Sequence, residues 1–236
     1  MFGASKNQDG TPGATVLIVG ANRGIGLELA RQYAARGWNV IGTAREPASA
    51  QDLQATGAKV SPLDVTDQAS VERLSESLEG IDIDLLIVNA GIQKLIWKLE
   101  DIDITAFEHS LHVNTLGPVR IICALLPNLR LGRQRKIVAI TSELASITDN
   151  TKGSFYGYRE SKAALNMFTR SLAAELGGEG FICVVLHPGW VRTDMGGPKA
   201  PLDVTESVNG LRAVIDSLTP QDNGSYRTHT GETLPW

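Results

Sequence analysis

Two side chains that could transfer a proton, Tyr158 and Lys162, lie four residues apart at the start of a predicted helix. Residues at positions i and i+4 share one face of a helix. A free tyrosine has a pKa of ~10, which is too high for easy proton transfer near neutrality. A lysine ammonium one turn away favours the phenolate and lowers that pKa. The pair is therefore predicted to act as a general acid toward a carbonyl oxygen, or as a base toward an alcohol.

Two further polar residues could complete such a site. Ser142 follows an apolar run, and at the end of a strand its hydroxyl could hydrogen-bond a developing oxyanion. Asn114 opens a predicted helix before that run. Asn89, Ala90 and Gly91 end another apolar run, and their small side chains would let a cofactor lie flat against the chain.

The same region offers alternatives for each role. Thr141 and Ser146 are hydroxyls that could replace Ser142, although Ser142 is the better placed. Tyr156 rivals Tyr158, but it has Glu160 and no lysine four residues later. We therefore interpret Tyr156 as a packing residue or a substrate contact.

A glycine-rich segment, GANRGIG at residues 20–26, lies between an apolar run and an amphipathic pattern. Glycines let the backbone approach a pyrophosphate, and a helix N-terminus adds free N–H groups and a positive dipole end. The spacing G-x-x-x-G-x-G differs from the more common G-x-G-x-x-G, and an ordinary glycine turn is the alternative. Between a strand and a helix, the segment predicts a dinucleotide site formed by Gly20, Asn22, Arg23, Gly24, Ile25 and Gly26.

The end of the second predicted strand indicates which dinucleotide this is. An NAD site needs a carboxylate there for the ribose 2′-hydroxyl, but this strand ends in Arg45, and Glu46 falls one residue too late. Two guanidinium groups, from Arg45 and Arg23, would suit a 2′-phosphate. The alternative is two solvated arginines, and we predict NADP(H) as the cofactor.

The elements that must position these residues alternate between strand and helix. Apolar runs predict strands, the amphipathic segments predict helices, and the end of the chain predicts a short strand and a turn. Strands that are apolar on both faces are typical of a doubly wound parallel sheet, a Rossmann-like α/β fold of about seven strands. The expected strands are 15–20, 39–43, 59–63, 84–88, 136–141 and 181–186; the expected helices are one from residue 26 to Gly37, and 67–78, 104–112, 116–129, 158–176 and 204–218.

Length and composition fit one such domain. The 236 residues are 42% hydrophobic and 20% charged, so they can bury a core, and we expect a single domain over 14–236 after a flexible arm at 1–13. A net charge of −4 argues against nucleic acid, and no apolar run is long enough to cross a membrane. Cys123 and Cys183 lie in apolar runs and predict buried, reduced thiols in a cytoplasmic protein, and the four histidines predict no metal site.

Together these motifs resemble the classical short-chain dehydrogenase/reductase family. The matching pieces also include LDVTD at 63–67, VNAG at 88–91 and PGWVRTDM at 188–195. YGYRESKAALN at 156–166 and GETLPW at 231–236 most resemble the subgroup of the bacterial C-factor signalling protein and the insect carbonyl reductase sniffer. Ser142 and Tyr158 are farther apart than is usual in the family, which agrees with this subgroup.

The resemblance implies a role for each matching residue. Tyr158 would donate the proton, Lys162 would lower its pKa and hold the nicotinamide ribose, and Ser142 would polarise the substrate carbonyl. Asn114 would anchor a water that relays protons to Lys162. The remaining cofactor contacts would come from Asp64, Val65, Asn89, Ala90, Gly91, Pro188, Gly189, Val191 and Thr193.

Substrate contacts would come from three loops, at residues 92–104, 143–157 and 190–203. Trp97, Leu144, Phe155, Trp190 and Met195 fall there and indicate an apolar or aromatic carbonyl compound. The helices at 116–129 and 158–176 carry more apolar residues than one sheet face needs, so we expect a homodimer or homotetramer.

The predicted function is an NADPH-dependent reductase of ketones or aldehydes. Two alternatives remain open. One is a signalling protein that binds NADP without catalysis, and the other is an isomerase or dehydratase of a biosynthetic pathway.

Overall fold

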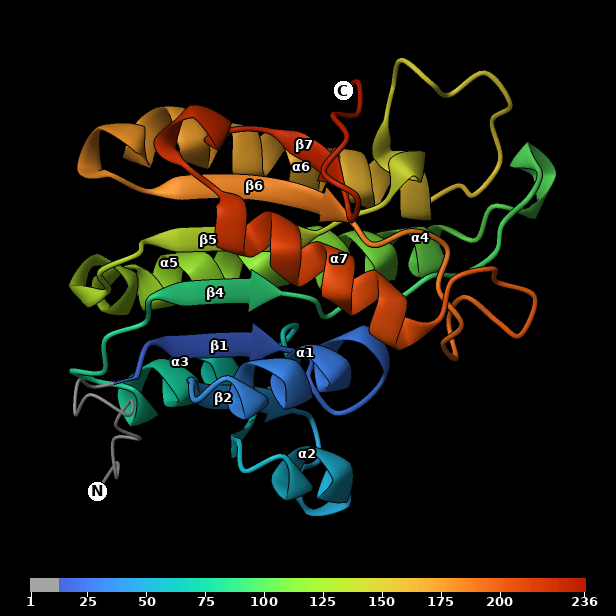
Figure 1. The fold of residues 1–236 in the computed structure, drawn as a ribbon. Helices are drawn as coiled ribbons and strands as arrows, with labels where there is room; N and C mark the ends of the chain where they lie inside the picture. The colour runs from blue at the N-terminus through green and yellow to red at the C-terminus, as the bar shows by residue number, and fades with distance from the viewer. Residues whose placement is uncertain (1–12) are drawn as a thin grey trace.

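A computed structural model describes residues 13–236 and contains one seven-stranded sheet whose neighbouring strands all run parallel. The strand order β3-β2-β1-β4-β5-β6-β7 reverses direction between β1 and β4, as in a doubly wound sheet. The predicted fold class is therefore confirmed (Figure 1). The strands are β1 (Thr15–Val19), β2 (Asn39–Ala44), β3 (Lys59–Pro62), β4 (Leu85–Val88), β5 (Lys136–Ile140), β6 (Ile182–His187) and β7 (Tyr226–Thr228).

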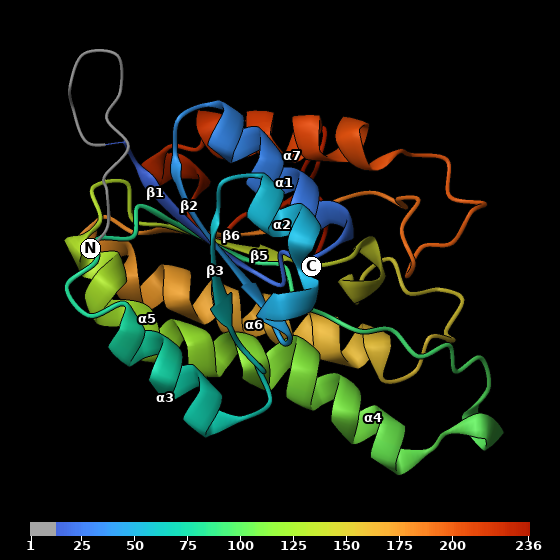
Figure 2. The same cartoon turned by 90° about the horizontal axis from the view of Figure 1, so that it is seen from below.

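Helices cover both faces of this sheet (Figure 2). One face carries α1 (Gly24–Ala35), α2 (Gln51–Ala55) and α7 (Val204–Ser217). The other carries α3 (Gln68–Ser77), α4 (Ile104–Leu111), α5 (Gly117–Leu131) and α6 (Tyr158–Leu176). None of the helices in residues 13–236 is long and apolar enough to cross a membrane.

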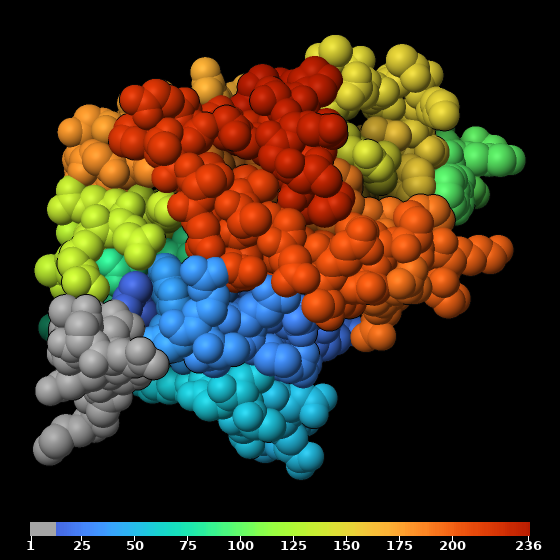
Figure 3. Space-filling model, in the orientation of Figure 1, coloured from blue at the N-terminus to red at the C-terminus, as the bar shows by residue number. Residues whose placement is uncertain are grey.

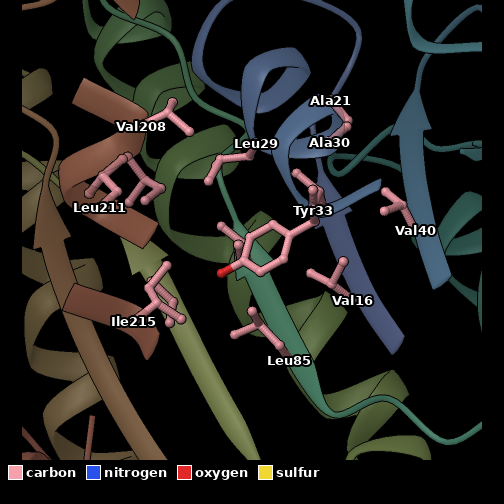
Figure 4. Close-up of a cluster of buried hydrophobic side chains, with 14 of the residues drawn as sticks. Val16, Ala21, Leu29, Ala30, Tyr33, Val40, Leu85, Val208, Leu211 and Ile215 are labelled. Atoms are coloured by element: carbon pink, nitrogen blue, oxygen red, sulfur yellow. The ribbon is translucent and has the colours of Figure 1, made fainter. Parts of the chain in front are cut away.

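The core between the sheet and α1 and α7 is mostly apolar and includes a buried phenol. Tyr33 of α1 is fully buried and lies among Val16, Leu85 and Ile215 (Figure 4). Burying a large apolar side chain is worth ~1.5–3 kcal/mol. Tyr33 also contacts Trp38, with ring centroids 4.9 Å apart, and its hydroxyl has no hydrogen-bond partner among the described residues.

Asp84 fixes the amino-terminal edge of the sheet. Its side chain is fully buried just before β4, and its carboxylate accepts hydrogen bonds from the backbone N–H groups of Thr15 (2.9 Å), Arg133 (2.9 Å) and Gln134 (3.3 Å). These donors open β1 and the turn that enters β5. One carboxylate therefore joins the starts of three neighbouring strands.

The structure corrects some local expectations. The predicted helices 104–112 and 116–129 are joined without a break, because a π-helical turn, His112–Leu116, connects α4 to α5. Pro47–Ser49 forms a 3₁₀ turn that leads into α2. The sequence patterns predicted neither this turn nor α2. Cys183 is buried as expected, but Cys123 is exposed because it lies on the outer face of α5, so the prediction of two buried thiols was wrong.

The predicted arm at residues 1–13 lies outside the described residues except for Gly13. The backbone carbonyl of Gly13 accepts a hydrogen bond of 2.9 Å from the Asn39 side chain. Among the described residues, no three His, Cys, Asp or Glu side chains are grouped so as to hold a metal ion.

We predict that Asp84→Asn lowers the free energy of unfolding by about 2–4 kcal/mol, because an amide N–H would then face backbone donors inside the protein. Urea unfolding measures the change. Asp82→Asn is the matched control: Asp82 is exposed two residues earlier, and its substitution is expected to cost less than about 0.5 kcal/mol. A loss below about 1 kcal/mol for Asp84→Asn would contradict the role assigned to this carboxylate.

Candidate active site

The glycine loop places the end of β1 against the end of β4. Gly20 has a φ of 79°, and a Cβ there would lie 2.8 Å from Cα of Ala90. A Cβ at Gly26 would lie 2.1 Å from the Gly20 carbonyl oxygen. The Asn89 side chain donates a hydrogen bond of 2.7 Å to that same carbonyl. The side of the loop that faces the end of β4 is therefore tightly packed. The N-terminus of α1, on the other side of the loop, remains open.

A cavity of about 860 Å³ begins at this loop and follows the carboxyl ends of the strands. Its size suits a ligand larger than a mononucleotide, since drug-sized ligands occupy ~300–1,000 Å³. Most predicted cofactor residues line it: Gly20, Asn22, Arg23, Gly24, Ile25, Arg45, Asp64, Val65, Asn89, Ala90, Gly91, Tyr158, Lys162, Pro188 and Thr193.

Three predicted cofactor residues do not line the cavity. Gly26 is buried beneath the loop, and Val191 is buried in a bridge with Leu202. Gly189 has a φ of 85° and lies against His229. These residues shape the backbone around the cavity. The wall also contains residues that were not predicted as cofactor contacts, although Thr66 belongs to the LDVTD segment; they include Thr43, Ser49, Thr66, Ile92, His109 and Val113.

Charged groups gather at the end of the cavity farthest from Tyr158. Arg45 is exposed there, and its charge helps to lower the pKa of Asp64, although hydrogen bonds from Thr66 lower it more. Arg23 also lines the cavity, but its guanidinium forms an exposed ion pair with Asp194. The two arginines thus border one cavity, and Arg23 would have to leave Asp194 to reach a phosphate beside Arg45.

Tyr158 and Lys162 line the opposite end. Glycine at 157, with a φ of 80°, starts α6 immediately before Tyr158, so the phenol stands at the first position of the helix. Burial raises the pKa of Tyr158, and a hydrogen bond with Ser142 acts in the opposite direction. Tyr158 is therefore protonated near neutrality.

Lys162 differs from the expectation drawn from helix spacing. Its ammonium donates a hydrogen bond of 2.8 Å to the Ile140 carbonyl, and complete burial lowers its pKa to about 8. Its charge is not among the causes that shift the pKa of Tyr158. The reason is physical: the ammonium is directed to the β5 backbone, and burial disfavours its own charge.

Ser142 and the two alternative hydroxyls have different partners. The Ser142 hydroxyl is nearly buried and accepts a hydrogen bond from Leu144 N–H (3.2 Å). Thr141 donates to Asn166 (2.7 Å), and Ser146 donates to the Trp236 carbonyl oxygen (3.3 Å). Of the three, Ser142 is the one whose hydroxyl is close enough to Tyr158 to lower its pKa.

Asn114 lies in the π-helical turn and holds the chain beside the tyrosine. Its side chain accepts from Ile92 N–H (2.8 Å) and donates to the Ile92 carbonyl (2.9 Å) and to the Ser161 hydroxyl (3.0 Å). Ser161 in turn donates to the Tyr158 carbonyl (2.8 Å). The sequence patterns did not predict a role for Ser161. Its position immediately before Lys162 was the one feature of the sequence that could have indicated it.

The predicted substrate contacts belong to loops that project at one end of the molecule (Figure 3). Of the five residues, Met195 lines the cavity, whereas Trp97, Leu144, Phe155 and Trp190 do not. Trp97 and Phe155 contact each other, with ring centroids 4.6 Å apart, and the Trp190 indole donates to the Gly196 carbonyl (2.8 Å).

This arrangement brings a protonated phenol and a buried amine to one end of a long cavity, with an arginine at the other end. The nearly buried hydroxyl of Ser142 does not itself line the cavity, whereas Thr141 does. A phenol and a hydroxyl that lie close together can both hydrogen-bond the same substrate oxygen atom, and the phenol can give that oxygen a proton. The glycine loop, the open helix N-terminus and Arg45 fit a phosphorylated dinucleotide.

Comparison with known proteins agrees with this geometry. A family model described as short chain dehydrogenase matches residues 14–202. C-signal of Myxococcus xanthus is 46% identical over 154 residues, which are 65% of this chain and 93% of that protein. The structure of the carbonyl reductase Sniffer of D. melanogaster has a TM-score of 0.89 at 32% identity and covers 95% of this chain and 100% of its own. The NADPH-bound carbonyl reductase from chicken fatty liver has a TM-score of 0.87 at 34% identity, covering 95% and 99%.

We predict that Gly26→Ala disrupts the glycine loop, because the new methyl group would collide with the Gly20 carbonyl. Overpacking of this kind costs about 1–3 kcal/mol. We expect a lower melting temperature and weaker NADPH binding, measured by thermal unfolding and by titration. Gly178→Ala is the matched control, since a Cβ at Gly178 meets no atom within 4 Å. Normal NADPH affinity in Gly26→Ala would show that the close approach is unnecessary.

Proposed function

The chain belongs to the short-chain dehydrogenase family, as its motifs predicted, and on that premise we propose that it is an NADPH-dependent reductase of carbonyl compounds. As a member of this family it is an oxidoreductase with carbonyl reductases among its structural neighbours. One observation carries the finer proposal. Tyr158, whose pKa the neighbouring Ser142 hydroxyl lowers against the effect of burial, lines the same cavity as Lys162 and Arg45.

The cavity fits NADPH better than NADH. Arg45 follows β2 and offers a guanidinium for a 2′-phosphate, where an NAD site would have a carboxylate. Asp64 and Val65 border the part of the cavity that would hold the adenine, and Gly20 and Gly24 border the part for the pyrophosphate. The chicken reductase, which is similar over nearly the whole chain, binds NADPH.

In the proposed mechanism, the substrate oxygen lies between two hydroxyl groups. The Ser142 hydroxyl hydrogen-bonds the carbonyl oxygen and polarises it, and Tyr158 gives that oxygen its proton. The bound cofactor supplies the hydride. The high pKa of Tyr158 suits this direction, because the phenol is protonated and ready to donate.

Lys162 and Asn114 support Tyr158 after it has given up its proton. The Lys162 ammonium, with its pKa lowered to about 8, can stabilise a nearby phenolate and exchange a proton near neutrality. Asn114 and Ser161 hold the first turn of α6 through the Tyr158 carbonyl, so that the phenol keeps its place. An alcohol could be oxidised by the same residues in reverse.

The mouth favours an apolar or aromatic substrate. Large apolar side chains are exposed on all three loops that are predicted to contact the substrate. Contiguous exposed apolar surface is uncommon in monomeric proteins, and where it occurs it commonly marks a binding site. Leu144 and Phe155 belong to the loop that joins Ser142 to Tyr158. The large apolar side chains that are exposed on the three loops are Leu95, Trp97, Leu99, Ile104, Ile147, Trp190 and Met195.

We further propose that copies of the chain associate through α5 and α6. Leu116 immediately before α5, and Met167 on α6, are exposed apolar residues on the outer face of this layer. A two-fold axis across these helices would bury both side chains.

The similarity to C-signal favours a signalling role without turnover as a second candidate. The combination of Tyr158, Ser142 and Lys162 counts against it, because a protein that only bound a nucleotide would not need a proton donor. NADPH binding without NADPH consumption, across a panel of aromatic and aliphatic carbonyl compounds, would favour the second candidate.

We expect Tyr158→Phe to lower the turnover of carbonyl compounds by about 100- to 10,000-fold, the usual contribution of a general acid. NADPH binding should be kept, since only the hydroxyl is removed. NADPH oxidation and a binding titration measure the two effects. Tyr33→Phe is the control, because it removes a buried hydroxyl that has no partner in residues 13–236. Unchanged turnover in Tyr158→Phe would refute the mechanism.

We expect Arg45→Asp to weaken NADPH binding by about 10- to 100-fold relative to NADH, since a hydrogen bond to a charged group is worth ~1.5–3 kcal/mol. The measurement is the ratio of the two dissociation constants. Arg73→Asp, at an exposed arginine of α3 that does not line the cavity, should leave the ratio unchanged. An equal loss for both cofactors in Arg45→Asp would show that this residue does not recognise the 2′-phosphate.

A further inference from the structure

The segment immediately before Tyr158 has a strained backbone. Ser154 has a φ of 60° and Phe155 a φ of 56°, and the glycines at 153 and 157 have φ values of 65° and 80°. Glycine adopts such angles freely, whereas serine and above all a bulky aromatic residue rarely do. Strain of this kind persists only where surrounding contacts over-determine the conformation.

Arg159 makes the contacts that hold this segment. Its Nε donates hydrogen bonds to the carbonyl groups of Ser154 (3.0 Å) and Gly153 (3.2 Å). Its Nη1 donates to the carbonyl of Leu144 (3.0 Å), at the other end of the same loop. The guanidinium carbon lies 5.8 Å from the centre of the Phe155 ring. One planar side chain therefore closes the loop from Leu144 to Phe155.

Phe155 connects the 143–157 loop to the loop at residues 92–104. Its ring packs against Trp97, with centroids 4.6 Å apart, and the next backbone N–H, of Tyr156, donates to the Ile96 carbonyl (3.1 Å). Trp97 keeps 55% of its surface exposed. The two loops leave β4 and β5 at the same edge of the sheet (Figures 1 and 2).

We propose that Arg159 is a positioning residue that holds Phe155 and Trp97 as an aromatic wall of the substrate mouth, and that this wall makes the enzyme select planar aromatic carbonyl compounds. The proposal rests on the reductase function proposed above. It assigns a task to Arg159, which neither the dinucleotide site nor the proton transfer uses.

The position of the wall fits this task. The Phe155 carbonyl accepts a hydrogen bond from the Tyr158 N–H (3.1 Å), so the backbone of Phe155 is tied to the first turn of α6, which carries the proposed proton donor. An aromatic substrate ring can stack in an offset or edge-to-face manner on a tilted aromatic pair, and a puckered ring of the same size cannot. Selectivity therefore depends on planarity rather than on volume.

The test compares two ketones that differ in the planarity of their rings, acetophenone and cyclohexyl methyl ketone, with purified protein and NADPH. The wild-type chain should prefer acetophenone in kcat/KM. We expect Arg159→Met to lower kcat/KM for acetophenone by about tenfold or more, mainly through KM, because loss of orientation alone costs up to ~100-fold. The value for the cyclohexyl ketone should change much less.

Arg135→Met is the matched control. Arg135 donates to backbone carbonyls (among them Arg130, 3.1 Å, and Gly132, 3.4 Å) and its guanidinium carbon lies 5.9 Å from the centre of an aromatic ring (Phe181), but these partners precede β5 and β6 and do not belong to the 143–157 loop. This variant should keep the ketone preference. Equal losses for both ketones in Arg159→Met, or no wild-type preference, would overturn the proposal. Failure of the wild-type chain to reduce any carbonyl compound would instead refute the proposed function.

Two further measurements separate loop order from stability. Hydrogen exchange of peptides covering 143–157 and 92–98 should rise in Arg159→Met and not in Arg135→Met, and this readout does not need turnover. Adding Ser154→Gly to Arg159→Met should restore part of the acetophenone preference, because glycine adopts the positive φ without strain. Unchanged exchange, or no restoration, would show that Arg159 does not hold the wall.

Discussion

The site depends on how closely the ends of β1 and β4 approach each other. The Gly20 carbonyl accepts a hydrogen bond from the side chain of Asn89, at the end of β4. Gly26, at the start of α1, packs against the same carbonyl. These strands are neighbours at the point where the strand order reverses, so their outgoing connections diverge and leave a crevice. Any larger side chain at Gly20 or Gly26 would push the two strand ends apart. The cavity exists because the backbone can approach so closely at its floor.

At the other end of the cavity, burial sets the electrostatics. Tyr158 and Lys162 are both buried, and burial disfavours the charged form of each: it raises the pKa of the phenol and lowers that of the amine. The hydrogen bonds that remain, from Ser142 to the phenol and from Lys162 to Ile140, orient the two groups. A protonated phenol beside an amine that titrates near neutrality is suited to proton donation, and the charges of these groups will respond to whatever binds beside them.

Sequence patterns predicted the parts of this site that local chemistry determines. The helix Tyr158–Leu176 was predicted at its exact bounds, because glycines flank it at both ends. Tyr158 and Lys162 followed from helical spacing, and the glycine loop followed from its position between strand and helix. The π-helical turn at Asn114 and the exposure of Cys123 could not be predicted in this way. Both depend on which neighbours pack against α4 and α5, and a single sequence does not contain that information locally.

The role of Arg159 shows the same limit in a sharper form. In the sequence it is one of the three residues between Tyr158 and Lys162, and a solvated arginine would be the ordinary interpretation. Its importance arises from backbone carbonyls at Leu144, Gly153 and Ser154, which no residue pattern encodes. The loop between Ser142 and Tyr158 is also longer than is usual in the family, so it needs an anchor of its own beyond the strand and helix that it connects. Because that anchor is the residue after Tyr158, the proposed proton donor, the aromatic wall and the phenol are positioned by the same turn of helix.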